Sequence, residues 1–192
     1  MSGRFWANVA SVLSGTALAQ AIPIVGSLVL TRLFAPAAYG GYSVWLGAVL
    51  IIAVIATLRL DMALAVIRDG EEREEAFGLV LATVLFIGLG LAALAVPVWL
   101  AGLIPHAFHT PLLLFSAVVA AMLAATCDTW QAMAAADGAY RMLIKLRIVQ
   151  ATLIVTLQIV ASLFWRSAEA LMAGHMSGLF LSVVFAAIVR RA

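Results

Sequence analysis

The chain has 192 residues, of which 66% are hydrophobic and 10% are charged, and its mean hydropathy is +1.16. A soluble domain of this size needs a charged surface, so the composition excludes one and predicts a protein whose solvent is lipid. The formal net charge of +2 is too small to indicate nucleic acid as a partner, and the single cysteine, Cys127, excludes an internal disulfide.

Six apolar segments are long enough to cross a bilayer, because a hydrocarbon core of about 30 Å needs about 20 helical residues. The runs are unbroken and rich in Ala and Leu, which favours helices over the short alternating strands of a membrane barrel. We therefore expect an all-α membrane protein with one unit over 1–192 and six transmembrane helices, at about 5–31, 39–66, 76–104, 112–133, 147–165 and 168–189.

The segments are separated by polar or helix-breaking residues. The first apolar run continues through Leu28, much further than the core of a signal peptide, so we expect a retained helix. Pro36 ends this run, Gly70 and an acidic stretch end the second, and residues 105–111 end the third. Residues 136–146 are expected to form the next loop. Only two residues join the last two segments, which predicts a tight antiparallel hairpin.

Small residues recur at helical spacing in two segments. A stripe at intervals of three and four runs along the first segment, and it allows either close helix contact or a bendable lining of a cavity. It consists of Ser11, Gly15, Ala19, Pro23 and Gly26. In the last segment Gly174 and Gly178 form a four-residue repeat that is typical of packed membrane helices.

The basic residues predict the orientation, because short cytoplasmic loops are enriched in Lys and Arg. With the N-terminus inside, the cytoplasmic side carries Arg4, Arg68, Arg73, Arg141, Lys145, Arg147, Arg190 and Arg191, which are eight of the eleven basic residues. Both termini are then expected to be cytoplasmic. Tryptophans near the predicted helix ends agree with this arrangement, since their rings prefer the headgroup region.

Three ionisable residues are predicted to lie within the spans, where charge is costly and therefore suggests function. Arg59 and Asp61 lie near the inner end of helix two, and Asp128 lies near the inner end of helix four. On one helix Arg59 and Asp61 point about 200° apart, so only one of them faces the bundle. They form either a charge pair or ion-coupling site at the mouth of a polar cavity, or, alternatively, a snorkelling arginine and two acids that mark helix ends.

Arg32, at the outer end of the first helix, is a second candidate cation, which either meets a phosphate in a vestibule or anchors to headgroups. Gln20 is a polar candidate within the same helix. His106 and His109 have the spacing of a ligand pair but no third ligand nearby, so we expect no metal site. Phosphate-binding glycine loops and nucleophile turns are absent from the sequence, so we expect neither an enzyme nor a cofactor.

Three segments carry short motifs. The stretch from Leu30 to Gly40 (LTRLFAPAAYG) has Arg-Leu, then Pro, then an aromatic residue and Gly, and in this it is similar to the first outer turn of polysaccharide flippases. Residues 58–64 (LRLDMAL) resemble the family's Leu-Arg-Leu-Glu-x-Ala-Ile, with Asp61 in place of the glutamate. Residues 139–150 (AYRMLIKLRIVQ) resemble the stretch that leads into helix five. The three matches lie between residues 30 and 150, and the resemblance as a whole spans about residues 10 to 160.

The resemblance is to the Wzx-like polysaccharide transporter branch of the multidrug/oligosaccharidyl-lipid/polysaccharide (MOP) superfamily, whose fold is MATE-like. It implies a flippase of the bacterial inner membrane that moves undecaprenyl-pyrophosphate-linked oligosaccharide outward by alternating access, for O-antigen or exopolysaccharide biosynthesis. Arg32 and Arg59 match motif positions, so the resemblance implies that they contact the pyrophosphate. Gln20, a polar residue within the first helix, is a further candidate for contact with pyrophosphate or sugar.

Family members have twelve to fourteen helices in two six-helix lobes, whereas this chain supplies one. A lone lobe exposes its cavity-facing polar groups to lipid. We therefore expect a second lobe as partner, either a missing C-terminal half or another protomer. Two other interpretations stay open: a cation-coupled small-molecule antiporter of the same fold, with Asp61 or Asp128 as the ion site, and a truncated remnant that transports nothing.

Overall fold

The computed structural model describes the backbone of residues 2–102 and 110–191 and the side chains of residues 13–102 and 110–190. Within these residues the chain is all-helical. Its elements are α1 (Ser2–Leu33), α2 (Pro36–Thr57), the 3₁₀ helix η1 (Leu60–Ala65), α3 (Glu71–Leu100), α4 (Pro111–Ala136), α5 (Tyr140–Ser162) and α6 (Ala168–Arg191). All six α-helices contain spans long and apolar enough to cross a membrane, which confirms that part of the sequence prediction and indicates a multi-pass membrane protein.

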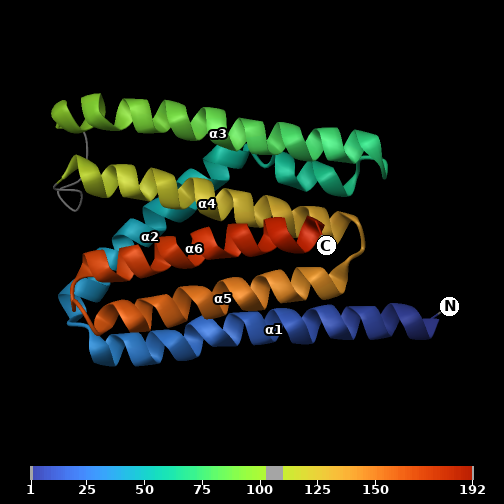
Figure 1. Ribbon diagram of the computed structural model, residues 1–192, viewed down its shortest axis with the longest axis horizontal. Coiled ribbons are helices and arrows are strands. Elements are labelled where there is room, and N and C mark those ends of the chain that lie inside the picture. Colours follow the sequence, from blue (N-terminus) through green and yellow to red (C-terminus); the bar gives the residue numbers. More distant parts are fainter. Residues whose placement is uncertain (1, 103–109, 192) are drawn as a thin grey trace.

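Both termini lie at the same end of the bundle (Figure 1). We call this the inner end and the opposite one the outer end, following the orientation that the basic residues predict. The turns from η1 to α3 and from α4 to α5 lie at the inner end, and the turns from α1 to α2 and from α5 to α6 lie at the outer end.

The structure corrects the predicted loop at residues 136–146. Helix α5 begins at Tyr140 and not at 147, so the turn from α4 consists of only three residues. Gly138 adopts φ +68°, a left-handed conformation that costs glycine nothing and lets the chain reverse sharply. The polar residues that predicted a loop therefore belong to the first turns of a helix, and Arg147 lies about 10 Å along α5 from its start.

The predicted continuous helix over 39–66 is also wrong at its inner end. Helix α2 stops at Thr57, and Leu58 and Arg59 adopt left-handed φ values of 49° and 58° before η1 begins. Two successive non-glycine residues in this region cost about 1–3 kcal/mol each. Burial of Leu64, which is fully enclosed beside Phe77 of α3 and a methionine of α4, contributes about 1.5–3 kcal/mol in the opposite direction.

Helix α4 occupies the centre of the bundle and packs against α2, α3, α5 and α6. Its face toward these neighbours is rich in alanine, with Ala117, Ala120, Ala121 and Ala125 completely buried. Helix α1 packs mainly on α5, while α2 packs mainly on α4 and touches α1 only lightly. Figure 1 shows α2 running obliquely from its turn with α1 to the side of α3, so the two helices diverge toward the inner end.

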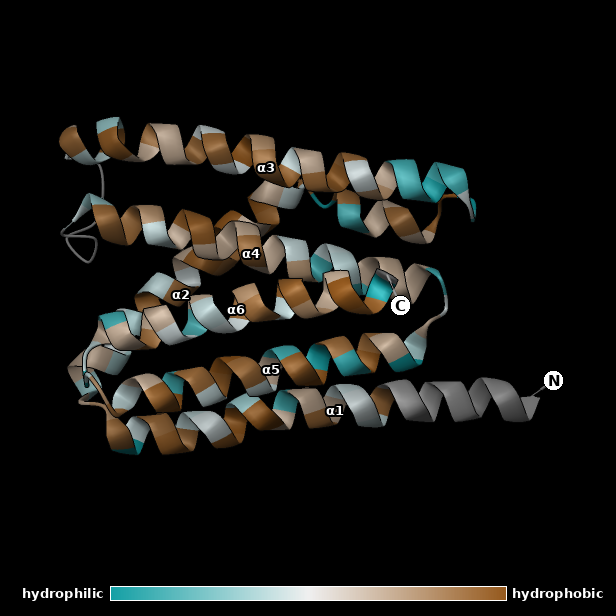
Figure 2. Cartoon of the chain, viewed as in Figure 1, coloured by the Kyte–Doolittle hydropathy of each residue, from teal (hydrophilic) through white to brown (hydrophobic). Residues whose placement is uncertain are grey.

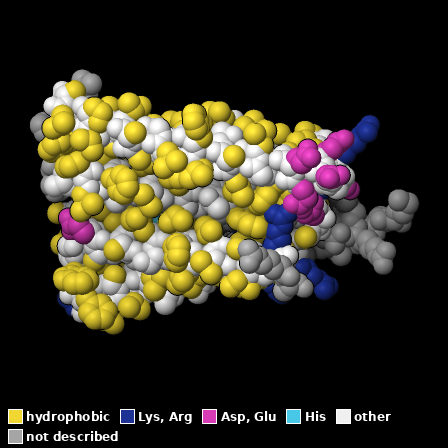
Figure 3. All heavy atoms as spheres, turned by 45° about the horizontal axis from the view of Figure 1, so that its top comes forward, with side chains coloured by type: hydrophobic (Ala, Val, Ile, Leu, Met, Phe, Trp, Pro, Cys, Tyr) yellow, Lys and Arg dark blue, Asp and Glu magenta, His cyan; other side chains and the backbone are white. Residues whose placement is uncertain are grey.

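The sides of the bundle are apolar. Large hydrophobic side chains such as Phe86, Leu112 and Ile51 are mostly exposed, the reverse of a soluble protein. Figure 2 shows hydrophobic residues along most of the helical length and hydrophilic ones gathered toward the inner end. In the space-filling view of Figure 3, acidic and basic side chains likewise cluster at that end, whereas hydrophobic side chains cover the flank. This distribution fits a lipid-facing surface.

Small residues make the closest helix contacts. A Cβ built on Gly174 would lie 2.7 Å from the Cα of Gln158, and one on Gly178 would lie 2.6 Å from the Cα of Ile154, so α6 meets the backbone of α5 directly. Gly15 and Gly26 of α1 pack in the same way on side chains of α5. The sequence prediction of close contact is confirmed for these positions. Ser11 lies outside the described side chains, and Pro23 is exposed.

Replacing Gly178 with alanine tests the contact between α5 and α6. The new Cβ would meet the backbone of Ile154, which cannot rotate away, so the two helices must move apart. We expect a loss of about 1–3 kcal/mol in the free energy of unfolding, although alanine favours a helix over glycine by about 1 kcal/mol. Unfolding of the purified protein in detergent, followed by tryptophan fluorescence, measures the difference.

Gly47→Ala is the matched control, because Gly47 lies in helix α2 and a Cβ there meets nothing within 4 Å. This variant should be as stable as the parent protein or slightly more stable. If Gly178→Ala were as stable as Gly47→Ala, the close contact would be contradicted.

Candidate functional site

A polar cleft opens between α1, α4 and α5, roughly two helical turns from the inner end. Its volume is about 350 Å³, and it is open on one side. The residues that line it are Thr16, Ala19, Gln20, Pro23, Gln131, Arg147, Gln150, Ala151 and Ile154. An arginine and three glutamines at this depth of an apolar bundle are costly to bury, which makes the cleft the main candidate for a functional site.

Arg147 is held in the cleft by neutral acceptors from two other helices. Its Nε donates to Oε1 of Gln131 on α4 at 3.1 Å, and its Nη1 donates to Oγ1 of Thr16 on α1 at 2.9 Å. Gln131 in turn donates from Nε2 to Oε1 of Gln150 at 2.6 Å. Within the described side chains no carboxylate forms an ion pair with Arg147. Its position is therefore fixed while its charge is left without a directly bonded counter-ion.

Arg59, Asp61 and Asp128 belong to the same electrostatic group. Asp128 interacts attractively with Arg147 and Arg59 and repulsively with Asp61. Arg59 and Asp128 are exposed, whereas Oδ1 of Asp61 is buried and has no hydrogen-bond partner. The sequence predicted that Arg59 and Asp61 lie on one continuous helix, and the structure differs, because the left-handed break separates Arg59 from α2 and places Asp61 in η1.

The other two candidates from the sequence fall in different places. Gln20 is exposed and lines the cleft. Arg32 is exposed in the last turn of α1 at the outer end, about 18 Å along the helix from Gln20, so the cleft does not include it. The histidine pair His106 and His109 lies outside the described residues.

Sequence reasoning missed three residues that define the cleft. Arg147 was expected among the loop cations, and Thr16 and Gln131 were not singled out. One signal was available: Gln131 follows Asp128 by three positions, and Gln150 follows Arg147 by three, so each pair shares a helix face. Two polar faces on neighbouring predicted spans indicate a shared lining.

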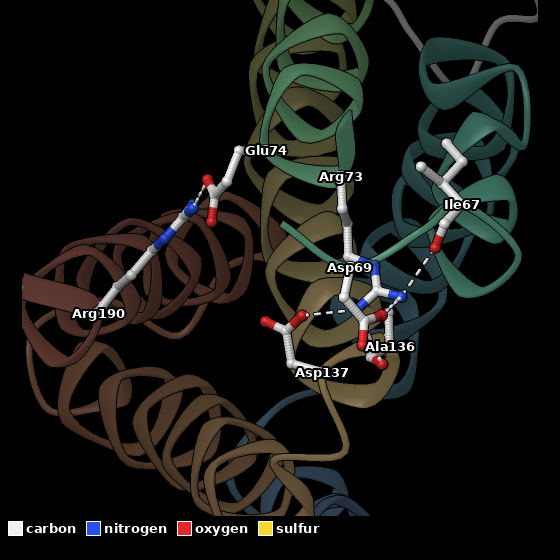
Figure 4. Close-up of polar contacts among 7 residues, drawn as sticks. All are labelled: Ile67, Asp69, Arg73, Glu74, Ala136, Asp137 and Arg190. Atoms are coloured by element: carbon white, nitrogen blue, oxygen red, sulfur yellow. Dashed lines mark hydrogen bonds and ion pairs between the residues drawn. The ribbon is translucent and has the colours of Figure 1, made fainter. Parts of the chain in front are cut away.

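A buried arginine fastens the inner end of the bundle (Figure 4). Arg73, in the first turn of α3, donates Nη1 to Oδ1 of Asp137 at 2.9 Å and to the carbonyl of Ala136 at 3.2 Å. Its Nη2 reaches the carbonyl of Ile67 at 2.8 Å and pairs with Asp69 at 2.5 Å. One guanidinium thus ties the loop after η1 to the turn between α4 and α5, which keeps η1 beside α4.

A second tie joins α6 to α3 at the same end. Arg190 pairs with Glu74, and its guanidinium lies over the rings of Phe77 and Trp130, at 4.5 and 5.1 Å from their centroids. Because Trp130 belongs to α4, this contact links three helices. Figure 4 shows the pair with Glu74 beside the Arg73 cluster.

Several buried polar residues near the outer end form hydrogen bonds within the core. Tyr42 of α2 shares a hydrogen bond of 2.9 Å with Nδ1 of His175 on α6, and Trp45 donates to Ser116 of α4 at 3.0 Å. Gln158 donates to the carbonyl of Leu171 at 3.3 Å. These contacts join α2 to α6 and α4 at the outer end. Toward the inner end α2 and α1 diverge, and the cleft between α1, α4 and α5 lies nearer to that end.

The fold and the cleft therefore define a multi-pass membrane protein with a polar, partly cationic cleft near its inner end. Comparison of the chain with family models, with curated protein sequences and with solved structures gives no match. In the described part of the chain no three His, Cys, Asp or Glu side chains gather in a group suited to a metal ion.

Arg73→Met tests the tie at the inner end. The methionine side chain fills similar space but has no N–H group to donate to the two backbone carbonyls or to Asp137. We therefore expect a clearly lower unfolding temperature in detergent. Arg73→Lys should recover part of the loss, because it restores the charge without the planar fork. Arg68→Met, which removes an exposed arginine of the same loop, should unfold like the parent protein. Equal midpoints for Arg73→Met and Arg68→Met would contradict the role given to Arg73.

Proposed function

We propose that the chain is one lobe of a flippase for lipid-linked oligosaccharide in the bacterial inner membrane, with both termini cytoplasmic and the cleft as part of the substrate pathway. The observation that carries the proposal is Arg147, a fixed arginine at membrane depth whose hydrogen-bond acceptors among the described side chains, Gln131 and Thr16, are neutral. Such a cation suits the pyrophosphate that links an oligosaccharide to undecaprenol. The resemblance of three segments to polysaccharide flippases agrees with this assignment.

The other cleft residues suit the sugar part of the same substrate. Gln20 and Gln150 carry amide groups that donate and accept hydrogen bonds, the usual contacts for hydroxyl groups. Arg59, which interacts electrostatically with Asp128 of α4, adds a second cation. Arg32 at the outer end is assigned to a later contact along the pathway, after the substrate has crossed.

The cleft is open on one side, and this is the reason for proposing a partner that covers it. Polar groups such as Arg59, Asp128 and Gln20 are exposed on this chain, and exposure to hydrocarbon would be costly. A second six-helix lobe, either further sequence or another protomer, would cover them and enclose a water-filled passage. Alternating access then consists of one lobe tilting against the other.

Deletion of the gene from the source bacterium tests the proposal. Lipid-linked oligosaccharide should accumulate on the cytoplasmic side and surface polysaccharide should fall, as measured by lipid extraction and by staining of surface glycans. Restoring the gene as Arg147→Gln should leave export about 10- to 100-fold lower, since a charge-assisted bond to phosphate contributes about 1.5–3 kcal/mol. Arg147→Lys should be intermediate.

Arg68→Gln is the charge-matched control and should restore export fully. Each variant's abundance and unfolding temperature are measured, so that a loss of export is not mistaken for a loss of folded protein. We expect these variants to fold, because the hydrogen-bond partners of Arg147 are neutral and replacing Arg147 leaves no charged partner behind. Normal surface polysaccharide in the deletion strain would overturn the proposal. Full function of a variant with alanine at Arg32, Arg59 and Arg147 would favour a scaffold or a remnant that transports nothing.

A second candidate function, a cation-coupled antiporter of small molecules, is favoured by one observation. The unpartnered Oδ1 of Asp61 lies in electrostatic contact with Asp128, and a pair of carboxylates can share a proton or bind Na⁺. An antiporter should lose coupling in Asp128→Asn, measured as drug efflux against an imposed Na⁺ or proton gradient. A flippase that relies on arginine contacts should keep its polysaccharide export in the same variant, so the two readouts separate the two functions.

A further inference from the structure

A second cavity lies at the inner end, where α4 turns into α5 and α6 ends. Its volume is about 480 Å³, and it belongs neither to the cleft nor to the Arg73 cluster. The main residues around it are Gly138, Tyr140, Arg141, Met142, Lys145 and Val189. A cavity of this size holds a small molecule or the headgroup of a lipid.

The charged residues among the described lining of this cavity are both cations. Arg141 and Lys145 are one helical turn apart on the same face of α5, and both are exposed. None of the described lining residues carries a carboxylate. Asp137, the acid of the adjoining turn, already accepts a hydrogen bond from Arg73 at 2.9 Å. The two cations therefore face the cavity without a lining counter-ion.

The start of α5 adds to this positive potential. Ala139, its N-cap residue, provides no capping side chain, and the first turn contains no acidic residue. The N–H groups of Tyr140 and Met142 donate to the carbonyls of Gly138 and Ala139, so this helix end contributes mainly the positive end of its dipole, which no side chain of the first turn neutralises. An anion placed beside Arg141 would meet this helix end as well as the two side chains.

The position and the remaining walls of the cavity point to a lipid. The turn lies where the spans α4 and α5 end, which is the depth of the headgroups, and the half-exposed ring of Tyr140 suits that layer. Met142 and Val189 give the cavity apolar walls that a free ion would not use. Cations at headgroup depth beside apolar walls match a phosphate ester that continues into acyl chains.

We propose that this cavity binds the headgroup phosphate of an anionic phospholipid from the inner leaflet, between Arg141 and Lys145. The acyl chains of that lipid lie against the apolar sides of α5 and α6. This site is independent of the proposed flippase function, because it shares no residue with the cleft.

Native mass spectrometry of the full chain, purified in detergent, tests the proposal with phosphatidylglycerol as the probe. The parent protein should retain one phosphatidylglycerol more tightly than phosphatidylcholine. Arg141→Gln and Lys145→Gln should each weaken this binding about fivefold, the usual contribution of one basic residue at an anionic membrane surface. Arg141→Lys should keep it, because the charge remains.

Arg68→Gln is the matched control, since it removes an exposed cation of the inner end that does not line the cavity. If it weakened lipid binding as much as Arg141→Gln, general surface charge would explain the binding and the site would be overturned. Displacement of the lipid by inorganic phosphate at equal concentration would identify a site for a soluble anion instead. Equal retention of phosphatidylcholine would also overturn the proposal. Unfolding temperatures show whether each variant is folded, and Lys145→Gln gives a second test if Arg141→Gln is not.

Discussion

The direct contact between the backbones of α5 and α6 is the interaction on which the rest of the bundle depends. In lipid the hydrophobic effect does not drive helices together, so close packing must hold them. Gly174 and Gly178 bring α6 against α5, and Gly15 and Gly26 bring α1 against the other side of α5. Helix α5 is therefore held from two sides, and α5 carries Arg147 and Gln150. The glycines thus position the polar cleft although none of these four lines it.

The cleft shows how a charge is kept inside an apolar bundle. A buried arginine paired with a carboxylate would be neutralised, and one without partners would be too costly to retain. Arg147 has a third arrangement: Gln131 and Thr16 accept its hydrogen bonds, while Asp128 interacts with its charge at longer range. The guanidinium is fixed in place and is not paired directly with a carboxylate of the described side chains, which is the arrangement that the proposed phosphate contact requires.

The sequence was sufficient for the fold class and for the approximate place of every span, because twenty-residue apolar runs have few alternatives in lipid. It was also sufficient to place Asp61, Asp128 and Arg59 in one region, since helices two and four end on the same side. The predicted start of α5 was wrong because Arg141, Lys145 and Arg147 are strongly hydrophilic, and hydropathy therefore assigned them to a loop. A helix forms its backbone hydrogen bonds whatever its side chains are. Polar residues that line a cleft or emerge from the bilayer therefore do not end the helix.

The break at Leu58 and Arg59 had no local signal at all. Neither residue is glycine, asparagine or proline, and isolated sequence would continue α2 through them. Tertiary contacts impose the break: Leu64 is buried beside Phe77, and Arg73 holds the loop that follows to the turn after α4. Arg73 and Ala136 are more than sixty positions apart in the sequence, and local hydrophobic periodicity cannot predict such a contact. The same break takes Arg59 and Asp61 off the opposite faces that a continued α2 would have given them, so their positions are set by the inner-end ties and not by the helix that precedes them.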